Sequence, residues 1–180
     1  MRVEGASTAS PTDSKHSRNV LSPFLSQAED YSEAERLPMS SLRDQLWKTA
    51  KAAFDEYGKM TPESVIAYRS SDCVHRMFPA AAGVADRTNR EYSDFVMELK
   101  KTVPNLRLIV QDGFGPVIDE TNRHVLAHIK SAGDTPFGPC ETEYFMALKM
   151  NEDATQIIEF VEFVDTAYTL EFIRRSGTKV

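Results

Sequence analysis

Glu162 is the residue of this sequence whose position most clearly invites chemistry. It lies in the run 159–166, which predicts a strand, and the alternation of strand side chains places it on the same face as Phe160 and Val164. An ionised carboxylate on an apolar face is costly unless a partner holds it or it stays protonated with a raised pKa. Glu162 is therefore a candidate general acid or base, with a structural carboxylate bound by the backbone or by an arginine as the equal alternative.

Three further polar residues are candidates to act with Glu162. Tyr144 lies on a predicted strand beside methionines and a leucine, where an aromatic residue is by itself most often part of the core. His75 could act as a proton shuttle, because the unperturbed pKa of histidine lies near neutrality, although an isolated histidine on a strand is usually satisfied locally. If Arg69 lies beside Glu162, the carboxylate is ionised and acts as a base. If Arg69 faces a substrate carbonyl, it stabilises an enolate while Glu162 acts as an acid, and the sequence leaves both roles open.

The sequence gives little support for a metal site or a disulfide. Its two cysteines, Cys73 and Cys140, lie far apart without a CxxC spacing, so we expect free thiols. His124 and His128 share a strand face, but four residues of strand separate them too widely for ordinary ligation of one metal ion. We therefore predict no metal.

Composition and charge restrict the class of protein. The chain has 180 residues, 41% of them hydrophobic and 27% charged, as in ordinary globular domains. Its formal net charge of -6 argues against a nucleic-acid partner, which would favour a basic face. No apolar run is long enough to span a bilayer and the first residues lack a secretory signal pattern. These features fit a cytoplasmic enzyme or adaptor.

The composition changes near residue 39 and divides the chain. Residues 1–38 are rich in Ser, Ala, Asp, Glu and Pro, and we predict a disordered tail, with a docking segment at 21–25 as the less favoured alternative. Residues 39–176 are predicted to form one domain, followed by a short tail over 177–180. Met39 is a further possible start of the natural protein.

The residues that typically begin and end helices and strands predict helices in the first part of the domain and strands afterwards. Capping, proline and glycine signals predict helices over 41–57, 62–69 and 88–103, and a last helix over 167–175. Alternating runs predict strands over 73–78, 106–114, 117–118, 124–131, 143–150 and 157–164, with a loop over 133–139. Helices beside a curved, hairpin-built sheet make an α+β fold that could enclose a cavity.

Three segments carry a resemblance to a known family: 68–75, the run Phe137-Gly138-Pro139 with Tyr144, and 162–166. They resemble the SnoaL-like isomerases and cyclases of fungal secondary metabolism, particularly of meroterpenoid pathways, over residues 40–175. The resemblance implies a cone like that of nuclear transport factor 2, with three N-terminal helices on a curved mixed, largely antiparallel sheet and a short C-terminal helix. It further implies a cofactor-free, commonly homodimeric enzyme that rearranges or cyclises a bulky hydrophobic, polycyclic substrate.

The resemblance also implies site residues. It assigns catalytic roles to Arg69, Tyr144 and Glu162, and it offers as substrate-binding residues Asp72, His75, Cys140 and Phe160. Cys140 departs from the family, which often has a tyrosine after Gly-Pro, so the substrate or reaction can differ. Alternatives on the same fold are rearrangement of a prenylated indole alkaloid, ring closure of a polyketide, and a non-catalytic dimeric binding module.

Large apolar side chains could line the implied cavity, although core packing explains most of them. They are Trp47, Phe54, Met77, Phe78, Phe95, Phe114, Phe145, Met146, Phe160 and Phe163.

Overall fold

The computed structural model describes residues 41–177. The predicted tail over 1–38, its docking segment and residues 178–180 lie outside the described residues. Within the described range no helix combines the length and apolar character needed to cross a membrane.

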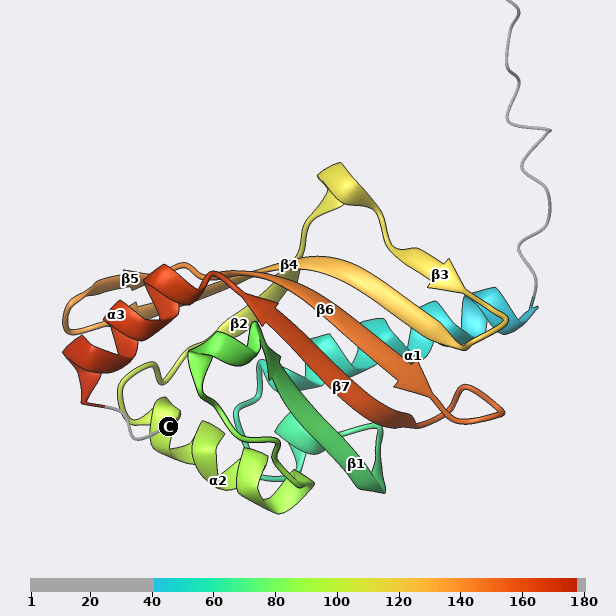
Figure 1. Ribbon diagram of the computed structural model, residues 1–180, viewed down its shortest axis with the longest axis horizontal. Coiled ribbons are helices and arrows are strands. Elements are labelled where there is room, and N and C mark those ends of the chain that lie inside the picture. The colour runs from blue at the N-terminus through green and yellow to red at the C-terminus, as the bar shows by residue number, and fades with distance from the viewer. Residues whose placement is uncertain (1–40, 178–180) are drawn as a thin grey trace, which may run out of the picture. The chain divides into compact units, whose positions relative to one another are not determined.

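Helices and strands alternate in the first half of the described chain, and strands dominate the second half (Figure 1). The helices are α1 (Ser41–Tyr57), α2 (Asn89–Lys100) and α3 (Thr166–Ser176), with short 3-10 turns η2 (Ser64–Ile66), η3 (Ala80–Ala82) and η4 (Asp112–Phe114). The strands are β1 (Arg69–Phe78), β2 (Arg107–Val110), β3 (Val117–Asp119), β4 (His124–Thr135), β5 (Gly138–Cys140), β6 (Glu143–Met150) and β7 (Ile157–Val164). The predicted strands 143–150 and 157–164 coincide with β6 and β7.

The strands form one curved mixed sheet in the order β1-β7-β6-β4-β2 (Figure 1), with β3 and β5 also paired to β4. Strand β1 runs parallel to β7, and the other pairs are antiparallel. The parallel pair arises because α2 and the following strands intervene between β1 and β7 in the sequence. The predicted mixed, largely antiparallel sheet is confirmed.

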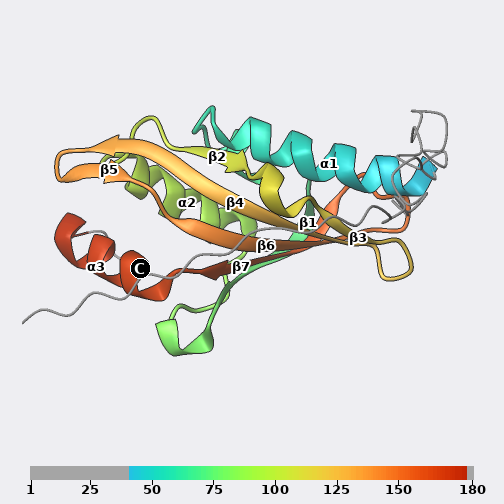
Figure 2. The same cartoon turned by 90° about the horizontal axis from the view of Figure 1, so that it is seen from above.

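Both long N-terminal helices cover the same face of the sheet. Helix α1 lies along β4 (Figure 2), where Leu46, Ala50 and Phe54 pack against buried residues of the central strands. Helix α2 contributes Tyr92 and Val96 to a second apolar cluster nearer the end of the sheet that carries β5. The sheet face towards the helices is therefore buried, and its two clusters leave room for a cavity beside α2.

The predicted helix over 62–69 is wrong. Only the turn η2 forms there, because Ala67 leaves the helical region at ψ 144° and Tyr68 takes a positive φ of 63°. These two residues turn the chain into β1, so Arg69 begins a strand instead of ending a helix. The expected arrangement of three N-terminal helices thus becomes two α-helices separated by a turn and a strand.

The capping signal of the next helix is confirmed. Thr88 and Glu91 form a capping box at the start of α2, with the Thr88 hydroxyl accepting from the Glu91 N–H and the Glu91 carboxylate accepting from the Thr88 N–H.

The predicted loop over 133–139 is also wrong, because β4 continues to Thr135 and β5 returns beside it. Gly133 lies inside this hairpin, where a Cβ atom would stand 2.5 Å from Cγ1 of Val103. Gly133 thus allows β4 to approach Val103 and Leu106 closely, and it does not mark a turn.

Candidate active site

A cavity opens between the sheet, α2 and α3. The unfilled space there, open mouth and adjoining solvent included, is about 680 Å³. Most of its wall is apolar: Met77, Phe95, Leu99, Leu106, Leu108, Met146, Val164, Phe172 and Ile173. The wall has few polar groups, so each of them strongly affects how a bound molecule is oriented.

Glu162 lies on the wall of this cavity. Strand β7 turns its side chain towards the helices, next to Met146 on β6, with which it is paired. The residue is 7% exposed, and its Oε1 accepts a long hydrogen bond of 3.4 Å from the Tyr92 hydroxyl. The predicted position on the apolar face is therefore correct, and a largely desolvated carboxylate borders the empty space.

His75 stands behind Glu162, away from the cavity. Its Nε2 atom lies 3.5 Å from Oε1 of Glu162, and its ring is stacked between Tyr92 and Phe160 at centroid distances of 3.9 Å and 5.1 Å. The imidazole is 1% exposed. It cannot reach a guest in the cavity, so its contact with the site runs through Glu162.

Arg69 completes a buried row of three charged or polar side chains. Its Nη1 atom lies 3.3 Å from Nδ1 of His75, and its guanidinium carbon is 4.3 Å from the Tyr92 ring centre and 4.4 Å from that of Phe160. Arg69 does not line the cavity. The row therefore runs from Arg69 through His75 to Glu162, which borders the cavity.

A bulge in β1 makes this row possible. Arg69 pairs with Ile157 of β7, but Val74 already pairs with Glu159, so five steps along β1 match two along β7. His75 is consequently only three β7 residues from the level of Arg69, about 10 Å instead of the 20 Å of a regular strand.

The electrostatics of the row favour an ionised carboxylate. Burial is the largest influence on the pKa of Glu162 and raises it, but His75, Arg69 and Arg87 together outweigh burial and hold that pKa below its usual range. Burial also lowers the pKa of His75, and this effect exceeds the opposing one of Glu162. Burial thus favours the neutral imidazole, and the positive charge of Arg69 and Arg87 favours the ionised carboxylate.

Three phenols share the cavity wall with Glu162. Burial and then the negative charge of Glu162 raise the pKa of Tyr57 and of Tyr144, and burial, Tyr57 and Glu162 raise that of Tyr92. All three phenols therefore stay protonated at neutral pH. Tyr92 donates its hydrogen to Glu162, and Tyr57 and Tyr144 can donate hydrogen bonds into the cavity.

No family model matches the chain. It is 40% identical over 131 residues to the austinoid biosynthesis clusters protein H of Penicillium brasilianum, an alignment that covers 72% of this chain and 88% of the relative. The solved structure of AusH from Aspergillus nidulans is 38% identical and covers 68% of this chain and 85% of that one, with a TM-score of 0.65. BvnE pinacolase from Penicillium brevicompactum is 30% identical, with a TM-score of 0.72 and coverage of 76% and 96%. A putative SnoaL-like polyketide cyclase from a Jannaschia species, at 13% identity and a TM-score of 0.59 over 80% of this chain and 99% of that one, shares the fold.

The chain belongs to the fungal SnoaL-like family of secondary metabolism. This family is of isomerase and cyclase type, as the resemblance in the sequence indicates.

The residues that the SnoaL-like resemblance pointed to are only partly brought together. Glu162, Tyr144 and Cys140 line the cavity. Arg69, His75 and Phe160 form the buried layer behind Glu162. Asp72 is exposed, and the hydrogen bond of Ser70 lowers the pKa of its carboxyl, so the structure places Asp72 outside the site.

Several aromatic candidates for the cavity lie on the opposite face of the sheet. Phe78, Phe114, Phe145 and Phe163 are 41%, 45%, 40% and 54% exposed. Phe78, Phe145 and Phe163 face away because strand side chains alternate, and Phe163 directly follows the inward-facing Glu162. Phe114 lies on η4, and its ring packs against that of Phe145.

Two functional candidates were missed in the sequence. In the sequence, Tyr57 is only the last apolar position of the first predicted helix, and Tyr92 is a residue that follows a helix cap. Their phenols meet Glu162 because α1 and α2 cover the same sheet face, and no short-range signal reports that. Among residues 41–177, no group of three or more histidine, cysteine or acidic residues is arranged to hold a metal ion.

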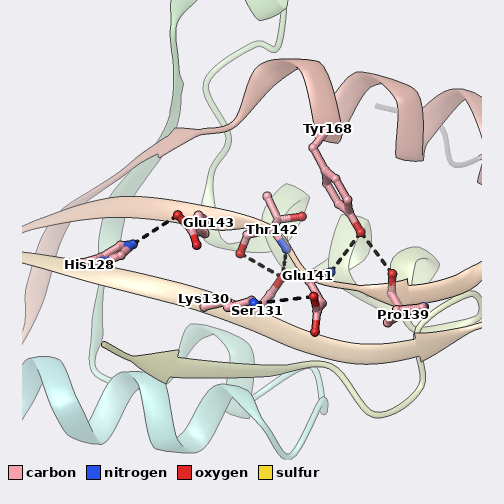
Figure 3. Close-up of polar contacts among 8 residues, drawn as sticks. All are labelled: His128, Lys130, Ser131, Pro139, Glu141, Thr142, Glu143 and Tyr168. Carbon is pink, nitrogen blue, oxygen red and sulfur yellow. Dashed lines mark hydrogen bonds and ion pairs between the residues drawn. The ribbon is translucent and has the colours of Figure 1, made fainter. Parts of the chain in front are cut away.

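Helix α3 covers part of the cavity. Its Thr169, Phe172 and Ile173 contribute to the wall. Figure 3 shows the Tyr168 hydroxyl between the β5 and β6 segments, where it donates to the Pro139 carbonyl at 3.2 Å and accepts from the Glu141 N–H at 3.0 Å. The same view shows Ser131 and Thr142, where the Ser131 hydroxyl donates to the Thr142 carbonyl and accepts from the Thr142 N–H.

Proposed function

We propose that this protein is a cofactor-independent isomerase or cyclase that rearranges a polycyclic, meroterpenoid-type intermediate by acid-base catalysis. The observation that carries the proposal is the position of Glu162, a desolvated carboxylate on the wall of a largely apolar cavity. A general base needs reach and a suitable protonation state, and Glu162 combines both.

The reaction begins when Glu162 takes a proton from a hydroxyl or an acidic C–H of the guest. Charge then develops on a guest oxygen, where the phenols of Tyr144 and Tyr57 stabilise it by hydrogen bonds. The proton returns at another atom, so the composition of the guest is unchanged, as an isomerisation requires. The apolar wall selects one conformer for ring formation or migration.

The placement of Arg69 favours the base role of Glu162 over the acid role. A guanidinium enclosed by Tyr92, Phe160 and His75 has no path to a substrate carbonyl. Its charge instead favours the ionised form of Glu162. Arg69 thus acts on Glu162 from the side away from the cavity.

The relatives support this type of substrate. The protein H relative is named for austinoid biosynthesis, and BvnE is named a pinacolase, which is a rearrangement activity. The departure at Cys140, which lines the cavity, is a place where this chain's own substrate can differ from theirs.

The test is a deletion of the gene followed by purification of the compound that accumulates. We expect the purified full chain to convert that compound without added metal or nucleotide to a product of the same mass. Glu162→Gln should lower turnover by at least about 100-fold. Glu159→Gln is the matched control, because Glu159 lies on the same strand and pairs with Arg76 away from the cavity. Wild-type turnover by folded Glu162→Gln would refute the proposal.

We further propose that the protein is a homodimer, formed through the outer face of the sheet. An aromatic row crosses this face, in register over β1, β7, β6 and β4: the exposed Phe78, Phe163 and Phe145, and the half-buried His128. An exposed apolar row of this length is typical of an interaction surface.

Charges of both signs flank the row, which suits a two-fold interface with a second copy. Lys130 pairs with Glu141, and His128 lies 3.6 Å from Glu143. Light scattering should show a dimer for the wild type and a monomer for Phe163→Asp, whereas Leu170→Asp on α3 should leave the dimer intact. A monomeric wild type at micromolar concentration excludes this interface.

A further inference from the structure

His75 is the one side chain of the buried row that contacts both of its neighbours. Arg69 lies at its Nδ1 atom and Glu162 at its Nε2 atom. The ring is held in plane by Tyr92 and Phe160, and its backbone is paired with Arg87 on one side and with Phe160 on the other. Both the position and the orientation of the imidazole are therefore fixed.

The neighbours also fix where its proton lies. A guanidinium has only donors, so the Nη1 of Arg69 at 3.3 Å requires Nδ1 of His75 to be an acceptor. A neutral imidazole with an accepting Nδ1 carries its hydrogen on Nε2. That N–H faces the Glu162 carboxylate.

The second contact is longer than a good hydrogen bond. Nε2 is 3.5 Å from Oε1 of Glu162 and has no hydrogen-bond partner within the described part of the chain. A buried N–H without a partner is uncommon and costly. Such a donor is positioned to shorten its contact once a guest fills the cavity and excludes water, because contacts in an active site often tighten only in the complex.

We propose that His75 is a positioning residue for Glu162: held by Arg69 through Nδ1, it directs its Nε2–H at the carboxylate and fixes that carboxylate on the cavity wall. Arg69 acts through His75 and does not touch the guest. This assignment rests on the proposed base role of Glu162, but the arrangement of protons can be tested without any turnover.

The first experiment is a nuclear magnetic resonance measurement of the full chain with 15N-labelled histidine. The chain has four histidines, and the signal that disappears in His75→Gln identifies His75. We expect an unprotonated Nδ1 and a protonated Nε2 at pH 7. A proton on Nδ1, or an imidazolium at that pH, overturns the proposal whatever the enzyme does.

Arg69→Met tests the role of the guanidinium. Methionine keeps an apolar stem between the Tyr92 and Phe160 rings but removes the donor and the charge. We expect His75 to lose its fixed tautomer and to take up a second proton at a higher pH than in the wild type. An unchanged His75 spectrum in Arg69→Met would show that Arg69 does not set the proton position.

The second experiment uses the compound that accumulates in the deletion strain. His75→Phe keeps the stacked ring but removes both nitrogens, and we expect kcat to fall by about 100-fold with KM little changed. The acid limb of the pH profile should move to higher pH, because the carboxylate loses a donor. His75→Gln restores an acceptor and a donor, and it should recover most of the rate.

The outcomes separate the two proposals. A rise in KM at constant kcat in His75→Phe would make His75 a binding residue and refute the positioning role. If the spectra agree with the expected tautomer but Glu162→Gln turns over normally, the proposed function fails while the buried hydrogen-bonded row stands.

Discussion

Asn89 donates from Nδ2 to the carbonyl oxygen of Ser70 at 2.7 Å and thereby ties the first residue of α2 to the bulge of β1. The bulge brings Arg69 to the level of His75, so this contact far from the cavity supports the geometry of the site. This hydrogen bond joins the start of α2 to the irregular part of β1.

Asn89→Asp should loosen the bulge while keeping the helix. An aspartate in the first turn suits the helix dipole, but its carboxylate cannot donate to Ser70 and repels the carbonyl. We expect faster amide hydrogen exchange over residues 70–73 and a loss of stability of about 1 kcal/mol. Thr88→Ala is the control, since it weakens the cap by about 1 kcal/mol without touching Ser70. Equal exchange over 70–73 in all three proteins would show that Asn89 does not hold the bulge.

His75 predicts a pH dependence of stability. Its pKa is lowered in the folded protein by burial and by Arg69 and Arg87, against the opposing effect of Glu162, while the unfolded chain has the ordinary value of about 6.5. Below about pH 6.5 the unfolded state therefore binds more protons, and stability falls as pH falls, by at most about 1.4 kcal/mol per pH unit.

Urea unfolding between pH 5 and 7.5 measures this dependence, and His75→Gln should have the flatter profile. The lowered pKa of Glu162 acts in the same direction but only at more acidic pH, because its stabilising effect is complete above the ordinary carboxyl pKa of about 4.3. Parallel profiles for wild type and His75→Gln would contradict the neutral, buried imidazole.

Tyr144→Phe should lower kcat by at least about tenfold, because one of two phenols that can stabilise an oxyanion is removed. The apolar wall is retained, so the thermal midpoint should change little. Tyr68→Phe is the control, since Tyr68 is 45% exposed and does not line the cavity. Steady-state rates on the accumulated compound decide the matter, and equal kcat for both variants would remove Tyr144 from the mechanism.

Gly133→Ala should destabilise the fold by about 1–3 kcal/mol, as overpacked sites do. The added Cβ would lie 2.5 Å from Cγ1 of Val103 and 3.3 Å from Cα of Leu106. Gly113→Ala is the matched control, because no atom lies within 4 Å of its added Cβ. Denaturant midpoints measure both changes, and a Gly133→Ala protein as stable as Gly113→Ala would mean that Val103 moves aside freely.

Local chemistry in the sequence determined much of the scaffold. The alternation of β6 and β7 gave their bounds and the inward direction of Glu162, and the Thr88 capping box gave the start of α2. Signals of this kind act over a few residues, where the backbone geometry and hydrogen-bonding needs of neighbouring residues suffice.

The site itself depended on contacts between distant residues. Tyr57, His75, Tyr92 and Glu162 come from four elements, and they meet only because two helices cover one face of a sheet in which β1 lies beside β7. The bulge of β1 is set by pairing with β7 and by Asn89, so the row from Arg69 to Glu162 has no signature in the spacing of its residues. The sequence alone determined which side chain is costly to bury, whereas the tertiary structure decided which partners surround it, because burial and pairing energies depend on neighbours that the chain brings together only on folding.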